Sequence, residues 1–243
     1  MRPAKFCCTR HLILLRFLVL CFLLVSTYPA VGEQGPRSLR VLVMGDSIAA
    51  GYGLDPGDAF PAQLQRIADD KGVKAEIVNG GLSGETSAGG VRRIDWLLRQ
   101  PVDVFVLLLG GNDALRGLAV DDTERNLLEI IRRVRERYPA VRVVLAGMKA
   151  PPNLGPDFTN RFEAIYPRVA EATQSTLIPF VLEGVAGVPA LNQTDGIHPT
   201  VEGQRIIAKT VWTSVEPLVR APERTSPSQL HRLDHESPRT LSE

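Results

Sequence analysis

Short apolar runs alternate with longer amphipathic stretches along most of the chain. The apolar runs are nearly continuous in β-branched and aliphatic residues, as expected of parallel strands covered on both faces. They occupy Leu39–Met44, Ala75–Asn79, Val102–Leu109, Val141–Ala146 and Leu177–Leu182. The stretches with helical spacing are Ala59–Lys71, Ala88–Leu98, Asp122–Arg137, Phe158–Thr173 and Val201–Pro217. This alternation predicts an α/β fold with three layers, in which helices cover both faces of a doubly wound, five-stranded parallel sheet.

The alternation also sets the domain organisation. No internal repeat or linker interrupts it, so we expect a single domain over residues 37–220. Residues 221–243 are poor in apolar side chains and rich in serine, proline and charge. Such a segment buries too little surface to order itself, and we expect a flexible tail.

Residues 1–32 have the layout of a secretory signal peptide. Four basic residues come first, the apolar run Phe17–Val25 follows, and the small residues Ala30 and Gly32 mark a cleavage position. The alternative is a retained membrane anchor, but a spanning helix needs about 20 apolar residues, and Arg16 interrupts the stretch. We expect an exported protein, periplasmic or secreted, that stays membrane-anchored only if the leader is retained.

Charge and cysteine content exclude several classes of function. Lys and Arg number 28 against 27 Asp and Glu, so no general positive field is present to attract nucleic acid. All three cysteines, Cys7, Cys8 and Cys21, lie in the predicted leader. The exported chain would therefore contain no disulfide, no thiol nucleophile and no cysteine–zinc site.

Candidate chemistry collects in the loops that follow the predicted strands, where parallel sheets bind their ligands. Of the four histidines, one is in the leader and two are in the tail, which leaves His198 as the imidazole base of the predicted domain. Asp195 precedes it by three residues. A histidine before a helix is ordinarily a surface or capping residue, and aspartate is common in turns.

Ser47 belongs to the block Gly45-Asp46-Ser47, which directly follows the first predicted strand. One interpretation is a helix cap that accepts a backbone hydrogen bond. The other is a nucleophile on a strand-to-helix elbow, beside backbone N–H groups at a helix N-terminus. Gly84 can offer a backbone N–H and Asn112 a side-chain amide from neighbouring loops. Together with the Ser47 N–H, these groups would provide three donors for an oxyanion.

Four sequence blocks resemble those of the GDSL, or SGNH, hydrolase family in order and approximate spacing. They are Gly45-Asp46-Ser47-Ile48, Gly84, Gly110-Gly111-Asn112-Asp113 and Asp195-Gly196-Ile197-His198-Pro199. The resemblance extends over residues 39–217 and is strongest to the bacterial branch of periplasmic thioesterases, lysophospholipases and arylesterases. Ile48 stands where the family name implies leucine, which is a conservative apolar change.

The resemblance implies a flavodoxin-like fold and a role for each motif residue. Ser47 resembles the nucleophile, His198 the general base, and Asp195 the residue that orients the imidazole. The Ser47 amide, Gly84 and Asn112 resemble the oxyanion hole. Neither a metal nor a cofactor is implied.

Three further residues, Arg116, Pro152 and Asn153, are expected to border the substrate site because they follow the third and fourth strands. Asp46 is expected to bond to local backbone, and Asp113 to shape the loop that holds Asn112.

The expected function is hydrolysis of aryl or acyl esters through an acyl-enzyme, with thioesters or lysophospholipids as further substrates. The expected partner is thus a small-molecule or lipid ester. One alternative is an O-acetyl esterase acting on carbohydrate, because the same site can hydrolyse acetyl esters. The other is a non-catalytic protein that holds lipid or glycan in the cleft.

Overall fold

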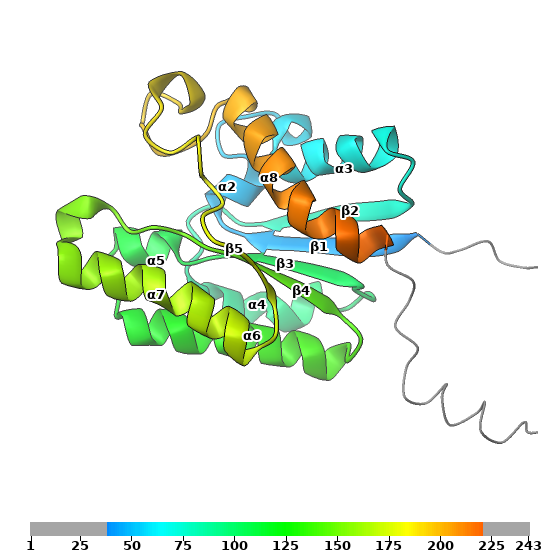
Figure 1. The fold of residues 1–243 in the computed structure, drawn as a ribbon, viewed down its shortest axis with the longest axis horizontal. Coiled ribbons are helices and arrows are strands. Elements are labelled where there is room, and N and C mark those ends of the chain that lie inside the picture. Colours follow the sequence, from blue (N-terminus) through cyan, green and yellow to red (C-terminus); the bar gives the residue numbers. More distant parts are fainter. Residues whose placement is uncertain (1–37, 221–243) are drawn as a thin grey trace, which may run out of the picture. The chain divides into compact units, whose positions relative to one another are not determined.

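The computed structural model describes residues 38–220 (Figure 1). The predicted leader, residues 1–32, and the predicted tail, residues 221–243, lie outside the described residues. Within residues 38–220, no helix combines the length and the apolar character needed to cross a bilayer.

A five-stranded parallel sheet forms the centre of the fold. Its strands are β1 (Leu39–Gly45), β2 (Ala75–Gly81), β3 (Val104–Leu108), β4 (Arg142–Ala146) and β5 (Thr176–Ile178). The spatial order is β2-β1-β3-β4-β5, so the chain changes direction across the sheet between β1 and β3. Loops that leave such a switch point diverge and open a crevice at the carboxyl ends of the strands. The predicted sheet and fold class are confirmed.

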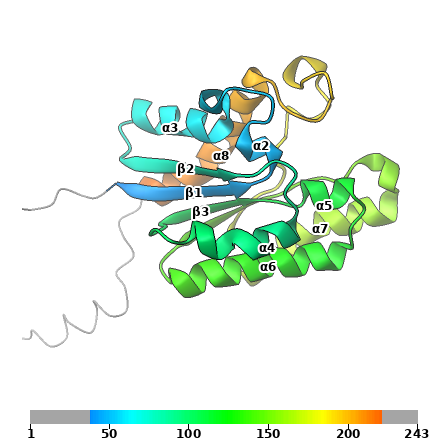
Figure 2. The same ribbon diagram turned by 180° about the vertical axis from the view of Figure 1, so that it is seen from behind.

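Helices cover both faces of the sheet, as Figures 1 and 2 show. On one face lie α3 (Phe60–Asp70) and α8 (Val201–Arg220), and on the other α4 (Ser87–Leu97), α6 (Val120–Arg137) and α7 (Pro156–Ala172). The sequence pattern predicted all five. It missed the short helices α2 (Ser47–Ala50) and α5 (Gly111–Leu115), which follow β1 and β3 and are too short to show a period. Three 3-10 turns occupy Pro56–Asp58, Pro152–Leu154 and Pro189–Leu191.

The fifth strand is shorter than predicted. It ends at Ile178 rather than at Leu182, because Pro179 has no N–H to continue the ladder. The Gly147 N–H donates to the Ile178 carbonyl at 2.7 Å, and the Val181 N–H donates to the Gly147 carbonyl at 3.0 Å. The chain therefore bulges at residues 179–180 between two backbone hydrogen bonds to the same glycine.

The core lies between the sheet and each helical layer. Every residue of β3 is fully buried, which explains why its sequence is apolar on both faces. Gln204 of α8 crosses this core to reach the first elements of the chain. Its side chain accepts from the Phe60 N–H at 2.9 Å and donates to the Ile48 carbonyl at 3.1 Å. The last helix is thereby fixed to the segment that follows β1.

Tyr166 of α7 provides a test of the buried hydrogen bonding. Its ring is fully buried, and its hydroxyl donates to the Leu109 carbonyl at 3.0 Å. Tyr166→Phe removes this bond inside the core, so we expect a loss of about 1–2 kcal/mol in the free energy of unfolding. Chemical denaturation measures the change. The matched control is Tyr138→Phe, whose hydroxyl donates to the Leu98 carbonyl at 2.9 Å from a half-buried position and should matter less. Equal losses would contradict the prediction.

Candidate active site

Ser47 begins the short helix α2 at the carboxyl end of β1. Asp46, rather than Ser47, caps this helix, because its Oδ1 accepts from the Ile48 N–H at 3.0 Å. The capping interpretation of the serine is therefore replaced by a capping aspartate. The Ser47 hydroxyl is left available for another partner.

That partner is His198. Its Nε2 lies 3.0 Å from Ser47 Oγ, and its Nδ1 lies 2.6 Å from Asp195 Oδ2. The structure thus joins Ser47, His198 and Asp195 in one chain of hydrogen bonds, although the serine and the histidine are 151 positions apart. If Nδ1 carries the proton and donates to the carboxylate, Nε2 accepts from the hydroxyl.

Asp195 is held as a charged acceptor. Its Oδ1 accepts from the backbone N–H groups of Ile197 and His198, both at 2.9 Å. The His198 backbone bond, followed by the bond to the imidazole, lowers the pKa of the Asp195 carboxyl from 3.8 to about 2. The carboxylate is therefore ionised at neutral pH and fixes the orientation of the ring.

The loop that carries His198 is tied to the loop after β1. The Gln193 side chain donates to the Tyr52 carbonyl at 2.7 Å and to the Pro199 carbonyl at 3.0 Å. The Tyr52 ring packs against the imidazole, with 4.4 Å between ring centroids. Sequence reasoning missed both Gln193 and Tyr52, since neither has a motif and their contact spans 141 positions.

Three hydrogen-bond donors lie in the cavity that contains the serine: the N–H groups of Ser47 and Gly84 and the amide of Asn112. Among the described residues, neither of the two N–H groups donates to a protein acceptor. The Asn112 amide donates one hydrogen to Asp46 Oδ2 at 3.3 Å and has a second one to offer. Gly84 has φ +77°, a conformation that favours glycine.

The segments that carry these donors are fixed by buried polar side chains. Asp113, 2% exposed, accepts from the Ser87 hydroxyl at 2.5 Å and from the Ser87 N–H at 2.9 Å, which anchors α5 and Asn112 to α4. This supports the prediction that Asp113 shapes the Asn112 loop. Sequence reasoning did not find the buried Glu85, which is ion-paired with Arg93 next to Gly84. Arg93 also donates to the Gly80 carbonyl at 2.8 Å.

The cavity has a volume of about 680 Å³ and a largely apolar wall. The three residues expected to border the substrate differ in position. Pro152 lines the cavity, whereas Asn153 and Arg116 are not among its lining residues. Arg116 donates instead to the Gly84 carbonyl at 3.0 Å and so connects the end of α5 to the Gly84 loop. The arrangement can hold a carbonyl group between the serine hydroxyl and the three donors.

A three-layer α/β fold with a serine, a histidine and an aspartate in hydrogen-bonded series at the carboxyl edge of the sheet is typical of hydrolytic enzymes. Known proteins agree with this class. The GDSL-like lipase/acylhydrolase family matches residues 43–206. Esterase TesA of Pseudomonas aeruginosa is 40% identical over 187 residues, which are 76% of this chain and 92% of the relative.

Two further proteins are similar over most of their length. Thioesterase 1/protease 1/lysophospholipase L1 of Escherichia coli is 36% identical over 199 residues, 82% of this chain and 91% of the relative. The crystal structure of the psychrotrophic esterase EstA from Pseudoalteromonas sp., inhibited by monoethylphosphonate, aligns with a TM-score of 0.70 at 30% identity. The alignment covers 75% of this chain and 99% of EstA.

The chain belongs to the GDSL-like lipase/acylhydrolase family. It is accordingly an ester hydrolase, and its substrates are small-molecule esters. The family resemblance predicted from the four motif blocks is confirmed.

Asp46 generates a prediction about pH and stability. It is 2% exposed, and burial raises the pKa of its carboxyl from 3.8 to about 6, more than the Ile48 N–H and the nearby His198 lower it. Between about pH 4 and pH 6, the folded protein keeps a proton that the unfolded chain has released. Its stability therefore falls as the pH rises through this window.

Asp46→Asn removes this titration. Between pH 4 and pH 7, we expect the wild type to lose up to about 3 kcal/mol of unfolding free energy relative to the variant, since one pKa unit corresponds to about 1.4 kcal/mol. Denaturant unfolding of both proteins at the two pH values measures the difference. Because the comparison is between two proteins, titrations common to both cancel. Parallel pH profiles would show that Asp46 does not keep its proton.

Proposed function

We propose that the protein is a serine ester hydrolase in which Ser47 is the nucleophile, His198 the general base and Asp195 the residue that orients the imidazole. The observation that carries this proposal is the chain of hydrogen bonds from Ser47 Oγ to His198 Nε2 at 3.0 Å and from His198 Nδ1 to Asp195 Oδ2 at 2.6 Å. The burial of the serine beside three donors supports it further.

The reaction proceeds in two halves. Ser47 Oγ attacks the carbonyl carbon while His198 Nε2 takes the hydroxyl proton, and the Asp195 carboxylate stabilises the imidazolium that forms. The negative oxygen of the tetrahedral intermediate accepts from the Ser47 and Gly84 N–H groups and from the Asn112 amide. Collapse expels the leaving group, which takes the proton from His198. Water then attacks the acyl-enzyme by the same route and releases the acid.

The substrates we propose are acyl esters of small to medium chain length, together with thioesters or lysophospholipids. The apolar wall of the cavity supports an acyl group, because alkyl chains gain most from leaving water. The relatives, an esterase and a thioesterase 1/protease 1/lysophospholipase L1, support the range of leaving groups. In a thioester, sulfur replaces oxygen as the leaving-group atom that receives the proton from His198.

The test is hydrolysis of p-nitrophenyl esters from acetate to palmitate. We expect Ser47→Ala to lower kcat by about 10³-fold or more, because loss of the nucleophile disables the whole triad. The matched control is Ser83→Ala, a second serine that lines the same cavity, and its rates should stay near those of the wild type. A fluorophosphonate should label the wild type at Ser47 and leave Ser47→Ala unlabelled.

Full activity in a correctly folded Ser47→Ala variant would contradict the assignment of Ser47 as the nucleophile. A profile confined to acetate would move the substrate class to O-acetyl esters of carbohydrate. Absence of hydrolysis at every chain length, with no labelling, would favour a protein that binds lipid or glycan without turning it over.

We also propose that residues 1–32 are an export signal that is removed. The basic start, the apolar run Phe17–Val25 and the small residues at 30 and 32 support it. Expression of the full chain in a bacterium with a periplasm should yield a protein that starts at Glu33, as mass spectrometry of the intact chain would measure. A full-length chain recovered with the membranes would point to a retained anchor instead.

A further inference from the structure

A second cavity of about 590 Å³ adjoins the active-site cavity at the outer edge of the sheet. Within residues 38–220 the sheet has no strand beyond β5, and α7 and α8 pass on either side of this edge (Figure 1). The cavity is lined by Leu177 and Ile178 of β5, by Glu163 and Pro167 of α7, and by Thr210 and Thr213 of α8. None of these residues takes part in the proposed chemistry.

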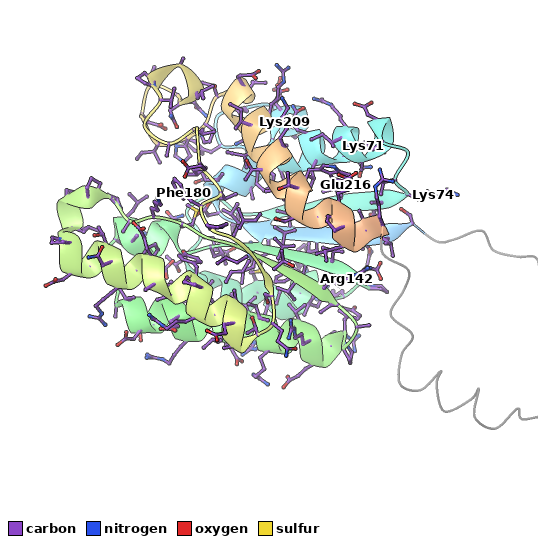
Figure 3. The ribbon with its side chains drawn as sticks, in the orientation of Figure 1. Lys71, Lys74, Arg142, Phe180, Lys209 and Glu216 are labelled. Carbon is purple, nitrogen blue, oxygen red and sulfur yellow. The ribbon has the colours of Figure 1, made fainter. Side chains whose placement is uncertain are left out.

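The two cavities share a wall. Met148, Lys149 and Phe180 line both of them. Phe180, on the segment that follows β5 (Figure 3), is half-buried, and Lys149 Nζ lies 4.8 Å from the centre of its ring. These three side chains therefore form the partition between the active-site cavity and the second one.

The backbone that carries the Phe180 ring is held by hydrogen bonds to Gly147. The bulge at Pro179–Phe180 lies between the two hydrogen bonds to Gly147, at 2.7 and 3.0 Å. A Cβ atom on Gly147 would lie 2.2 Å from the Pro179 carbonyl oxygen, so only glycine permits the approach. The position of the Phe180 backbone is therefore set by its approach to Gly147.

Lys149, in contrast, is free to move. It is exposed, and within residues 38–220 the contact of its ammonium is with the Phe180 ring and not with a carboxylate. A lysine stem can swing across apolar surface while its charge stays in water, and the loss of one exposed cation–π contact costs little. The side chain can therefore open the partition without breaking an ion pair.

We propose that the second cavity receives the distal end of medium-length acyl chains such as dodecanoyl, which pass over Phe180 when the Lys149 side chain swings aside. This inference rests on the proposed function, since the chain would be the acyl group held on Ser47. The side of the cavity formed by Leu177, Ile178 and Pro179 is apolar and suits methylenes. Elsewhere the lining includes the charged side chains of Lys149, Glu163 and Glu183, so the methylenes lie against this one apolar side.

The experiment compares kcat/KM for p-nitrophenyl dodecanoate and butanoate, below the concentration at which the longer ester forms micelles. Phe180→Ala removes the ring from the partition and should raise the dodecanoate-to-butanoate ratio about tenfold, because each newly sheltered methylene is worth up to about fourfold. Thr213→Phe fills the second cavity from the exposed side of α8 and should lower the ratio. In the double variant, the gain from Phe180→Ala should disappear.

The matched control is Leu115→Ala, because Leu115 lines the active-site cavity and not the second one. Whatever this change does to the ratio, Thr213→Phe should not reverse it. Unchanged ratios in both Phe180→Ala and Thr213→Phe would overturn the inference. If Phe180→Ala does not fold, the effect of Thr213→Phe on the wild type decides alone. Failure of the proposed function has a different signature, namely a wild type that does not hydrolyse butanoate.

Discussion

The candidate site depends on one contact, the hydrogen bond between Ser47 Oγ and His198 Nε2. The two residues belong to loops at opposite ends of the described chain, and a parallel sheet brings both loops to the same edge. Each contact that fixes the position of one of these loops also helps to hold the two atoms at hydrogen-bonding distance. Asp195 sets the ring from one side, Tyr52 packs on its face, and Gln193 ties the two loops together. Several separate interactions, and not a single one, therefore hold the serine and the imidazole in this geometry.

The donors opposite the serine are supported in another way, by polar groups buried under the loops. Asp113 anchors the Asn112 segment through Ser87, and the Glu85–Arg93 pair braces the Gly84 loop against the ends of β1 and β2. Burying such groups is costly unless every partner is present. Because the partners are present here, the buried groups hold the loops rigidly and keep the donors aimed into the cavity. Fixed dipoles of this kind need no reorganisation during the reaction.

Much of this was predictable from the sequence. The period of the apolar residues gave the five strands and the five long helices, and the motif blocks led to Ser47, Asp195, His198, Gly84 and Asn112, which the structure places in or beside one cavity. The rest depends on contacts between distant positions. The strand β5 ends early because Pro179 follows it and Gly147 faces it. The resulting bulge at residues 179–180 places Phe180 between the two cavities. Gln193, Tyr52 and Arg93 carry no local signal, since an ordinary polar or aromatic residue acquires its role only from its neighbours in space.

The attachment of α8 to the start of the domain determines when the site can exist. Gln204, in the last helix, bonds to Phe60 and to Ile48, which directly follows the serine, and His198 lies just before this helix. The serine and the histidine therefore come together only after the final helix has docked on elements about 150 positions earlier. A chain whose last helix has not yet docked contains both side chains but lacks the contact between them. The geometry of the candidate site is thus a property of the whole described domain, and no part of the domain contains it alone.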